Sequence, residues 1–161
     1  TVPSGPGLTN HHEFTVEILA KMASLPSADA SRYGLFDRNG VMSMFLYAGD
    51  GGAGLPHLRC MNHDVDVTFT TERYMPFACT ANADTDRVNA YLDGQRVFVE
   101  EGGTALPPDG GWTNPLFLLA NDPSGDIFRG EVASIRMFAR VRTAKAIARA
   151  AGDAGDAGDD D

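Results

Sequence analysis

The sequence feature that most constrains the fold is a succession of short segments in which apolar and polar residues alternate. Each segment ends in a turn rich in glycine, asparagine or aspartate. Phe14, Val16 and Ile18, near the start of the chain, occupy every second position, as residues on one face of a strand do. Farther along, Asn39-Gly40 is the strongest short signal for a β-hairpin. We count roughly ten such segments, without the intervening helices of a βαβ fold, so the pattern predicts a sandwich or a barrel.

One segment near the end of the chain is expected to be helical. Residues 143–151 (TAKAIARAA) are rich in alanine, and Thr143 can cap a helix. Residues 151–161 repeat Ala-Gly-Asp and offer little to bury, so we expect them to be a disordered acidic tail. Residues 1–12 are rich in glycine, proline and serine, which is typical of a flexible arm. The prediction is a single domain over residues 13–150, and a chain of 161 residues that is 43% hydrophobic can form its core.

The charge of the chain excludes some classes of partner. The formal net charge is −9, and the aspartates of the tail account for more than half of it. No basic face is visible that could neutralise phosphates, so nucleic-acid binding is not expected, and adhesion to anionic membranes is disfavoured for the same reason. The longest apolar stretch, Val41 to Ala48, is too short for membrane insertion.

Several motifs occur in an order that is similar to one known superfamily. They are an opening FTVE strand, a strand ending in YLDG, an LFLLAN strand followed by FRGEV, and a closing SIRMFAR strand with a short helix: residues 14–17, 88–94, 116–132 and 134–147. The chain resembles the laminin-G-like and concanavalin A-like lectin domains over about residues 13–150. The resemblance implies an all-β fold, an antiparallel two-sheet β-sandwich of the jelly-roll type with one short C-terminal helix. It also implies that the opening and closing strands are neighbours.

The two cysteines leave two interpretations. Cys60 is in phase with Leu58, and Cys79 with Phe77, so both sulfur atoms face the core if those neighbours do. A disulfide between them would close a loop of about 20 residues and contribute about 3 kcal/mol. It would require an oxidising compartment. The alternative is a pair of unlinked core thiols.

Calcium is the candidate cofactor, because many domains of the superfamily that this chain resembles bind it at the rim of the sandwich. A tight loop offers three hard oxygen ligands, from Asn121, Asp122 and Asp126. The segment Asn82–Asp86 also has alternating oxygen ligands, but it lacks the glycine and the glutamate of an EF-hand. Asparagine and aspartate also favour turns, so ordinary turn chemistry explains both segments equally.

The candidate ligand surface is the loop that contains the single tryptophan. Trp112 lies in a segment rich in glycine and proline, together with Asp109 and Asn114. An exposed tryptophan beside amide and carboxylate groups binds sugar rings by stacking and hydrogen bonding. The alternative, which we favour for the ring itself, is that Trp112 folds back to close the edge of the sandwich.

No catalytic or zinc-binding arrangement is visible. A glycoside hydrolase needs two suitably placed carboxyl groups, and the E-x-D-x-E pattern is absent, since Asp64 and Asp66 share a strand face without a glutamate. His63 is expected to share a face with Val65 and not with these aspartates. Glu17 on the opening strand is interpreted as structural. We therefore do not expect an enzyme.

The sequence predicts a non-catalytic recognition module, secreted or at the cell surface. It would bind a glycan or an extracellular protein through its rim loops, and the basis for this function is mainly the resemblance. The first alternative is a structural spacer or interaction domain within a larger surface protein. The second, more remote, is a degenerate glycoside hydrolase.

Overall fold

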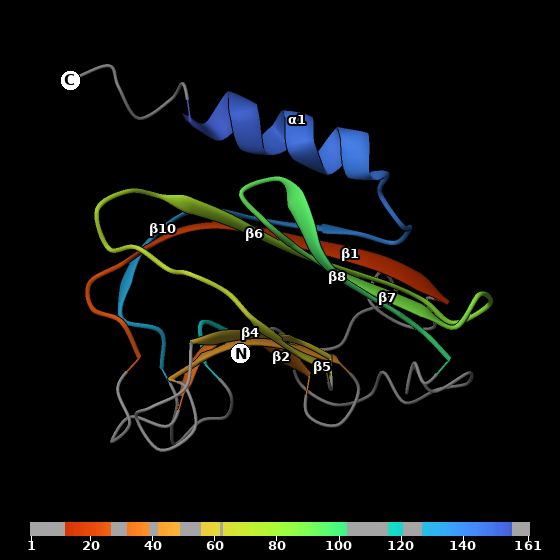
Figure 1. Ribbon diagram of the computed structural model, residues 1–161, viewed down its shortest axis with the longest axis horizontal. Coiled ribbons are helices and arrows are strands. Elements are labelled where there is room, and N and C mark those ends of the chain that lie inside the picture. The colour runs from red at the N-terminus through yellow and green to blue at the C-terminus, as the bar shows by residue number, and fades with distance from the viewer. Residues whose placement is uncertain are drawn as a thin grey trace.

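The computed structural model of this chain is a sandwich of two sheets with one helix above it (Figure 1). The structure describes residues 12–26, 32–38, 42–48, 56–61, 63–102, 116–120 and 127–155. Within these residues, ten strands form two five-stranded sheets in which all paired strands are antiparallel. The predicted fold class is therefore confirmed. The helix of the described part is too short and too polar to cross a bilayer.

The first sheet joins the two ends of the domain. Its strand order is β10-β1-β6-β7-β8. The strands are β1 (Glu13–Met22), β6 (Met75–Asn82), β7 (Arg87–Leu92), β8 (Gln95–Glu101) and β10 (Gly130–Phe138). The opening strand β1 pairs with the closing strand β10, with Ile18 opposite Ile135, as predicted. Asp93 and Gly94 form the turn between β7 and β8 with φ angles of 52° and 72°, the conformation for which an Asp-Gly hairpin is suited.

The second sheet has the order β5-β4-β3-β2-β9. Its strands are β2 (Arg32–Arg38), β3 (Met42–Tyr47), β4 (His57–Cys60), β5 (His63–Asp66) and β9 (Phe117–Leu118). β2 and β3 form an antiparallel hairpin, as predicted, with Asp37 opposite Ser43 and Arg38 opposite Met42. The turn residues Asn39 and Gly40 themselves lie outside the described residues.

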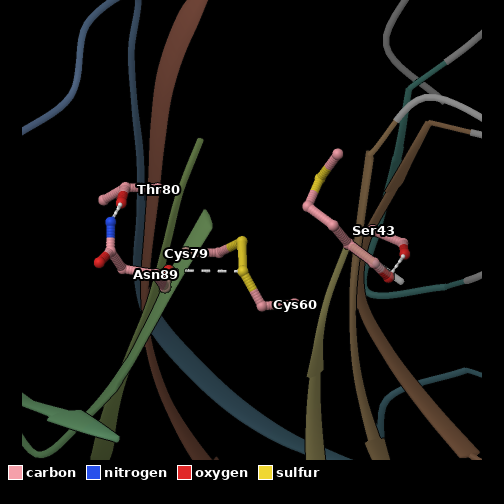
Figure 2. The surroundings of a disulfide bond; sticks show 6 residues. Ser43, Cys60, Cys79, Thr80 and Asn89 are labelled. Carbon is pink, nitrogen blue, oxygen red and sulfur yellow. Dashed lines mark hydrogen bonds between the residues drawn. A yellow bond between two sulfur atoms is a disulfide. The ribbon is translucent and has the colours of Figure 1, made fainter. Parts of the chain in front are cut away.

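The core lies between the two sheets and contains a disulfide. Leu46 and Leu58 of the second sheet are completely buried, and Val16 of the first is 1% exposed. Cys60 on β4 and Cys79 on β6 are linked across the sheets, with their Cα atoms 5.8 Å apart (Figure 2). The disulfide interpretation of the two cysteines is therefore confirmed.

Helix α1 (Ala144–Gly155) covers the outer face of the first sheet (Figure 1). Thr143 caps it as predicted, because its Oγ1 accepts a hydrogen bond from the backbone N–H of Ala146 at 3.2 Å. Ile147 packs on Ala78 and Tyr91 in a small apolar cluster of its own. Thr15 and Glu17, on the face of β1 opposite the core, are buried as well. Residues 140–142, which lead to α1, form hydrogen bonds with both side chains.

The predicted acidic tail begins later than expected. Helix α1 continues to Gly155, so the prediction of disorder is wrong for residues 151–155. Alanine has the highest helix propensity, and the alanines that follow Ile147 allow the helix to continue past the expected boundary at residue 150. Residues 156–161 lie outside the described part of the chain, and their disorder stays a prediction.

Candidate functional site

The residues predicted to bind a ligand or calcium are not among those that the structure describes. They are Asp109, Trp112, Asn114, Asn121, Asp122 and Asp126. Their roles therefore stay predictions. The segment Asn82–Asp86 is described, and there Asn82 Oδ1 accepts a hydrogen bond from Thr85 N at 2.9 Å, which is ordinary turn chemistry.

A second group of chemically suited residues lies on the outer face of the second sheet, turned away from the first sheet and from α1. On β3, Met44 and Leu46 point into the core and are fully buried, which places Phe45 and Tyr47 on the outer face. On β4, Leu58 points inward, and its neighbours His57 and Arg59 point outward. We define the outer-face cluster by its members: Arg32, Phe45, Tyr47, His57, Arg59, Asp64 and Asp66.

Strand register brings the cluster together from four strands. Tyr47 on β3 lies between Arg32 on β2 and His57 on β4 as a Cα partner of each. On the far side of β4, Asp64 of β5 is the partner of Arg59. Side chains opposite one another on the same face of a sheet are within contact distance, so these strands produce a continuous polar and aromatic row.

Two arginines flank the ring of Tyr47. Arg32 Nη1 donates a hydrogen bond to the Tyr47 hydroxyl at 3.1 Å, and the guanidinium carbon of Arg32 lies 5.0 Å from the ring centre of Phe45. From the neighbouring strand, the guanidinium carbon of Arg59 lies 4.8 Å from the ring centre of Tyr47. Both contacts are within the range of cation–π attraction, which holds these groups in fixed positions.

An ion pair completes the row. Arg59 Nε and Nη2 donate to Asp64 Oδ1 and Oδ2 at 2.7 and 2.5 Å, a bidentate arrangement. The hydrogen bond with Asp64 raises the pKa of Arg59 above its ordinary value. Both side chains remain accessible, with 31% of Arg59 and 39% of Asp64 exposed. His57 Nδ1 lies 3.6 Å from Asp66 Oδ1, so both aspartates on this face have a partner.

This arrangement suits the recognition of a polyhydroxylated ligand. A guanidinium group offers several N–H donors in one plane, and a carboxylate accepts from several directions. In the cluster, the guanidinium of Arg59 and the carboxylate of Asp64 hold each other in place. His63, in contrast, shares the inward-facing side of β5 with Val65, as predicted, and stacks on Phe98 at 5.3 Å between ring centres. Within the described segments, no three His, Cys, Asp or Glu side chains gather as a metal site.

A groove on the opposite side of the molecule has a similar ion pair. It has a volume of about 370 Å³ and runs beside α1, where Tyr74, Pro76 and Ala151 line it. Arg73 Nη1 and Nη2 donate to Asp93 Oδ1 and Oδ2 at 2.9 and 2.5 Å. The Arg73–Asp93 pair is therefore bidentate like Arg59–Asp64, although Arg73 donates from Nη1 and Nη2 and Arg59 from Nε and Nη2. It lies on the other face, which makes it a control for the outer-face cluster.

Comparison with protein families identifies the family of this domain. A family model described as the concanavalin A-like lectin/glucanases superfamily matches residues 1–148. The chain belongs to this superfamily. The resemblance predicted from the motifs is thus confirmed. No curated protein sequence matches the chain.

The solved structures that are similar to this chain include carbohydrate-binding proteins and complexes with oligosaccharides. A candidate carbohydrate binding protein from Bacteroides ovatus is 18% identical, with a TM-score of 0.72 over 92% of this chain and 43% of its own. The CBM40 of the Ruminococcus gnavus IT-sialidase, bound to α2,3-sialyllactose, is 12% identical, with a TM-score of 0.66 over 87% and 83%. Domain 4 of the Geobacillus stearothermophilus arabinanase AbnA, in complex with arabinotriose, is 17% identical, with a TM-score of 0.64 over 92% and 70%.

These likenesses show the fold of the lectin-type domain and not its ligand, since the identities are low. The chain spans less than half the length of the Bacteroides ovatus protein. The activity, substrates and partners of such longer proteins are therefore not assigned to this chain, and its function is stated below as a proposal.

Proposed function

We propose that this domain binds carbohydrate, without catalysis, through the outer-face cluster. The observation that carries the proposal is the row in which Tyr47 lies between Arg32 and Arg59 and Arg59 is bound to Asp64. The row combines an aromatic ring with fixed donors and acceptors on one accessible face. Sugar recognition uses the same combination, since apolar contact with a ring is joined to hydrogen bonds with hydroxyl groups.

The fixed geometry of the row favours binding for an entropic reason. Holding a flexible side chain still costs about 0.5–1.5 kcal/mol on association. The bidentate pair with Asp64 and the contact with Tyr47 already restrict Arg59 before a ligand arrives. A ligand therefore meets donors that are already in place.

Membership of the superfamily, and the solved structures that are similar to this chain, support the same proposal. The chain belongs to a superfamily of lectins and glucanases, and two of the similar structures are complexes with sialyllactose and arabinotriose. Fold likeness alone does not transfer a ligand. The cluster adds chemistry from this chain's own residues.

A glycan array followed by calorimetry with the full chain tests the proposal. We expect at least one glycan to bind. Replacing Arg59 by Ala, or Tyr47 by Ala, should weaken that binding by about tenfold or more, which corresponds to ~1.4 kcal/mol. Arg73→Ala is the matched control, because it breaks the same kind of ion pair on the opposite face, and it should leave affinity unchanged.

Two outcomes would overturn the proposal. One is an array on which no glycan binds above background. The other is loss of binding in Arg73→Ala with normal binding in Arg59→Ala, which would move the site to the groove beside α1. Hydrolysis of chromogenic glycosides by the unmodified domain would contradict the non-catalytic part.

Rim loops and calcium form a second part of the proposal. Trp112, with Asp109 and Asn114, is proposed to extend the sugar-binding surface, and calcium is proposed to bind at Asn121, Asp122 and Asp126. Millimolar calcium should then raise the melting temperature, and Asp122→Ala should abolish the rise. Unchanged melting in calcium would remove the metal, and normal glycan affinity in Trp112→Ala would remove the loop contribution.

A secreted or cell-surface location is proposed on the basis of the disulfide. Structural disulfides persist in oxidising compartments and are rare in the cytosol. The Cys60–Cys79 link is buried in the core. Its complete formation in protein isolated under conditions that block thiol exchange would support this location, and free thiols in that protein would contradict it.

A further inference from the structure

The distribution of positive charge in this chain narrows the class of sugar that the cluster can bind. The chain contains 13 lysines and arginines, and all of them lie in residues that the structure describes. The other segments contain no lysine or arginine, and their charged groups are aspartates such as Asp29, Asp50 and Asp109. Wherever these segments lie, they therefore add no arginine or lysine to a binding site.

Few cations belong to the second sheet. Its strands carry Arg32, Arg38 and Arg59. Arg38 is 1% exposed, so a ligand on the surface does not reach it. Arg59 is held by both oxygens of Asp64. The outer-face cluster contains two arginines, Arg32 and Arg59, and two aspartates, Asp64 and Asp66, so its formal charge is balanced when His57 is neutral.

An anionic sugar would meet unfavourable electrostatics at such a site. Its carboxylate would have to compete with Asp64 for Arg59, and Asp66 would repel it. The net charge of −9 on the whole chain would also slow the approach of an anion at low salt. A neutral sugar meets neither difficulty, since its hydroxyl groups can donate to aspartate oxygens and accept from guanidinium groups.

We infer that the outer-face cluster binds an uncharged saccharide and discriminates against sugars that carry a carboxylate. The inference rests on the proposed function, because it names the ligand class of the same site. The expected ligand therefore differs from that of the similar Ruminococcus gnavus CBM40, whose structure contains sialyllactose, an acidic sugar.

Matched pairs of oligosaccharides, with and without a terminal sialic acid or uronic acid, test the inference by calorimetry. The neutral member of a pair should bind at least about tenfold more tightly. Its affinity should change little between about 50 and about 500 mM salt, because no net charge is neutralised on binding. Equal or tighter binding of the acidic member overturns the inference and leaves the proposed function intact. Binding of no sugar at all removes the proposed function itself.

A substitution that neutralises one aspartate locates the effect in the cluster. Asp64→Asn removes the carboxylate that occupies Arg59, and should raise the affinity for the acidic member by about tenfold. Asp93→Asn is the control, because it changes the charge of the chain equally but acts on Arg73 on the other face. An equal gain in both variants overturns the inference, since overall charge would then explain the discrimination.

The measurements are repeated with a chelator and with millimolar calcium. Calcium is a source of positive charge that the aspartate-containing segments could recruit. The preference for the neutral member should hold in both conditions. A preference for the acidic member in calcium overturns the inference.

Discussion

Cys60 on β4 and Cys79 on β6 join the two sheets through a disulfide that the core encloses, since the two residues are 0% and 2% exposed. Cys60 directly follows Arg59, so the link also fixes the strand that carries His57 and Arg59. Figure 2 shows the disulfide in the gap between the sheets, with the hydrogen-bonded side chains of Asn89 and Thr80 on the far side of the first sheet. The bond thus connects the stability of the core to the position of the outer-face cluster.

Reduction of this disulfide should lower the free energy of unfolding by about 3 kcal/mol, as expected for a closed loop of roughly 20 residues. Urea denaturation of the oxidised and reduced forms of the same chain measures the difference without changing a residue. The double variant Cys60→Ala, Cys79→Ala should lose more, because it also removes buried atoms. Identical midpoints for the two redox forms would show that the link does not stabilise the fold.

Sequence periodicity predicted the inner faces of the strands well. β1 occupies the expected residues, and Leu58 and Phe77 place both cysteines in the core as their phase implied. The Asp93-Gly94 turn has the expected positive φ angles. These features depend on residues that are close together in the sequence, through the alternation along a strand and the residue types of a turn.

Features that depend on distant segments were not predicted. The alternation in β1 suggested one buried face, yet Thr15 and Glu17 on the other face are buried as well. Residues 140–142, far along the chain, form hydrogen bonds with both side chains. Tyr47 and Arg59 belong to different hairpins, and only the strand register brings them together. The sequence signal for their location was that each follows a buried leucine, Leu46 or Leu58, and therefore points to the outer face of its strand. The loop residues predicted from composition, such as Trp112, lie outside the described part of the chain.

A buried carboxylate holds the segment that leads to α1. Glu17 is 6% exposed and accepts a hydrogen bond from Arg142 Nη1, while Arg136 Nε lies 3.6 Å from its second oxygen. Glu17→Ala should destabilise the fold by about 3 kcal/mol, since it leaves a partly buried guanidinium without its partner. The control is Glu101→Ala, whose pair with Arg87 is exposed and should contribute less than about 1 kcal/mol. Comparable losses in urea denaturation would contradict a structural role for Glu17.

Gly130, at the start of β10, is required by a close approach of the backbone. A Cβ atom at this position would lie 2.1 Å from the carbonyl oxygen of Lys21, and φ is 155°. Gly130→Ala should therefore cost about 3 kcal/mol or more, or prevent folding. Gly152→Ala is the control, because nothing lies within 4 Å of the added methyl group and alanine favours the helix by up to about 1 kcal/mol. Thermal melts of both variants measure the contrast, and a stable Gly130→Ala would refute the predicted clash.

Tyr91, which is 3% exposed and packs against Ile147 of α1, should make stability depend on pH in the alkaline range. Burial raises the pKa of Tyr91 above its ordinary value of 10.0, while Arg96 and Arg87 lower it to a smaller extent. The folded state then keeps its proton at a pH where the unfolded state loses it. The stabilisation is complete below about pH 10 and is lost as the pH rises through the folded-state pKa. In urea denaturation, Tyr91→Phe should show a flatter decline between about pH 9 and about pH 11. An equally steep decline in Tyr91→Phe would show that other groups cause it.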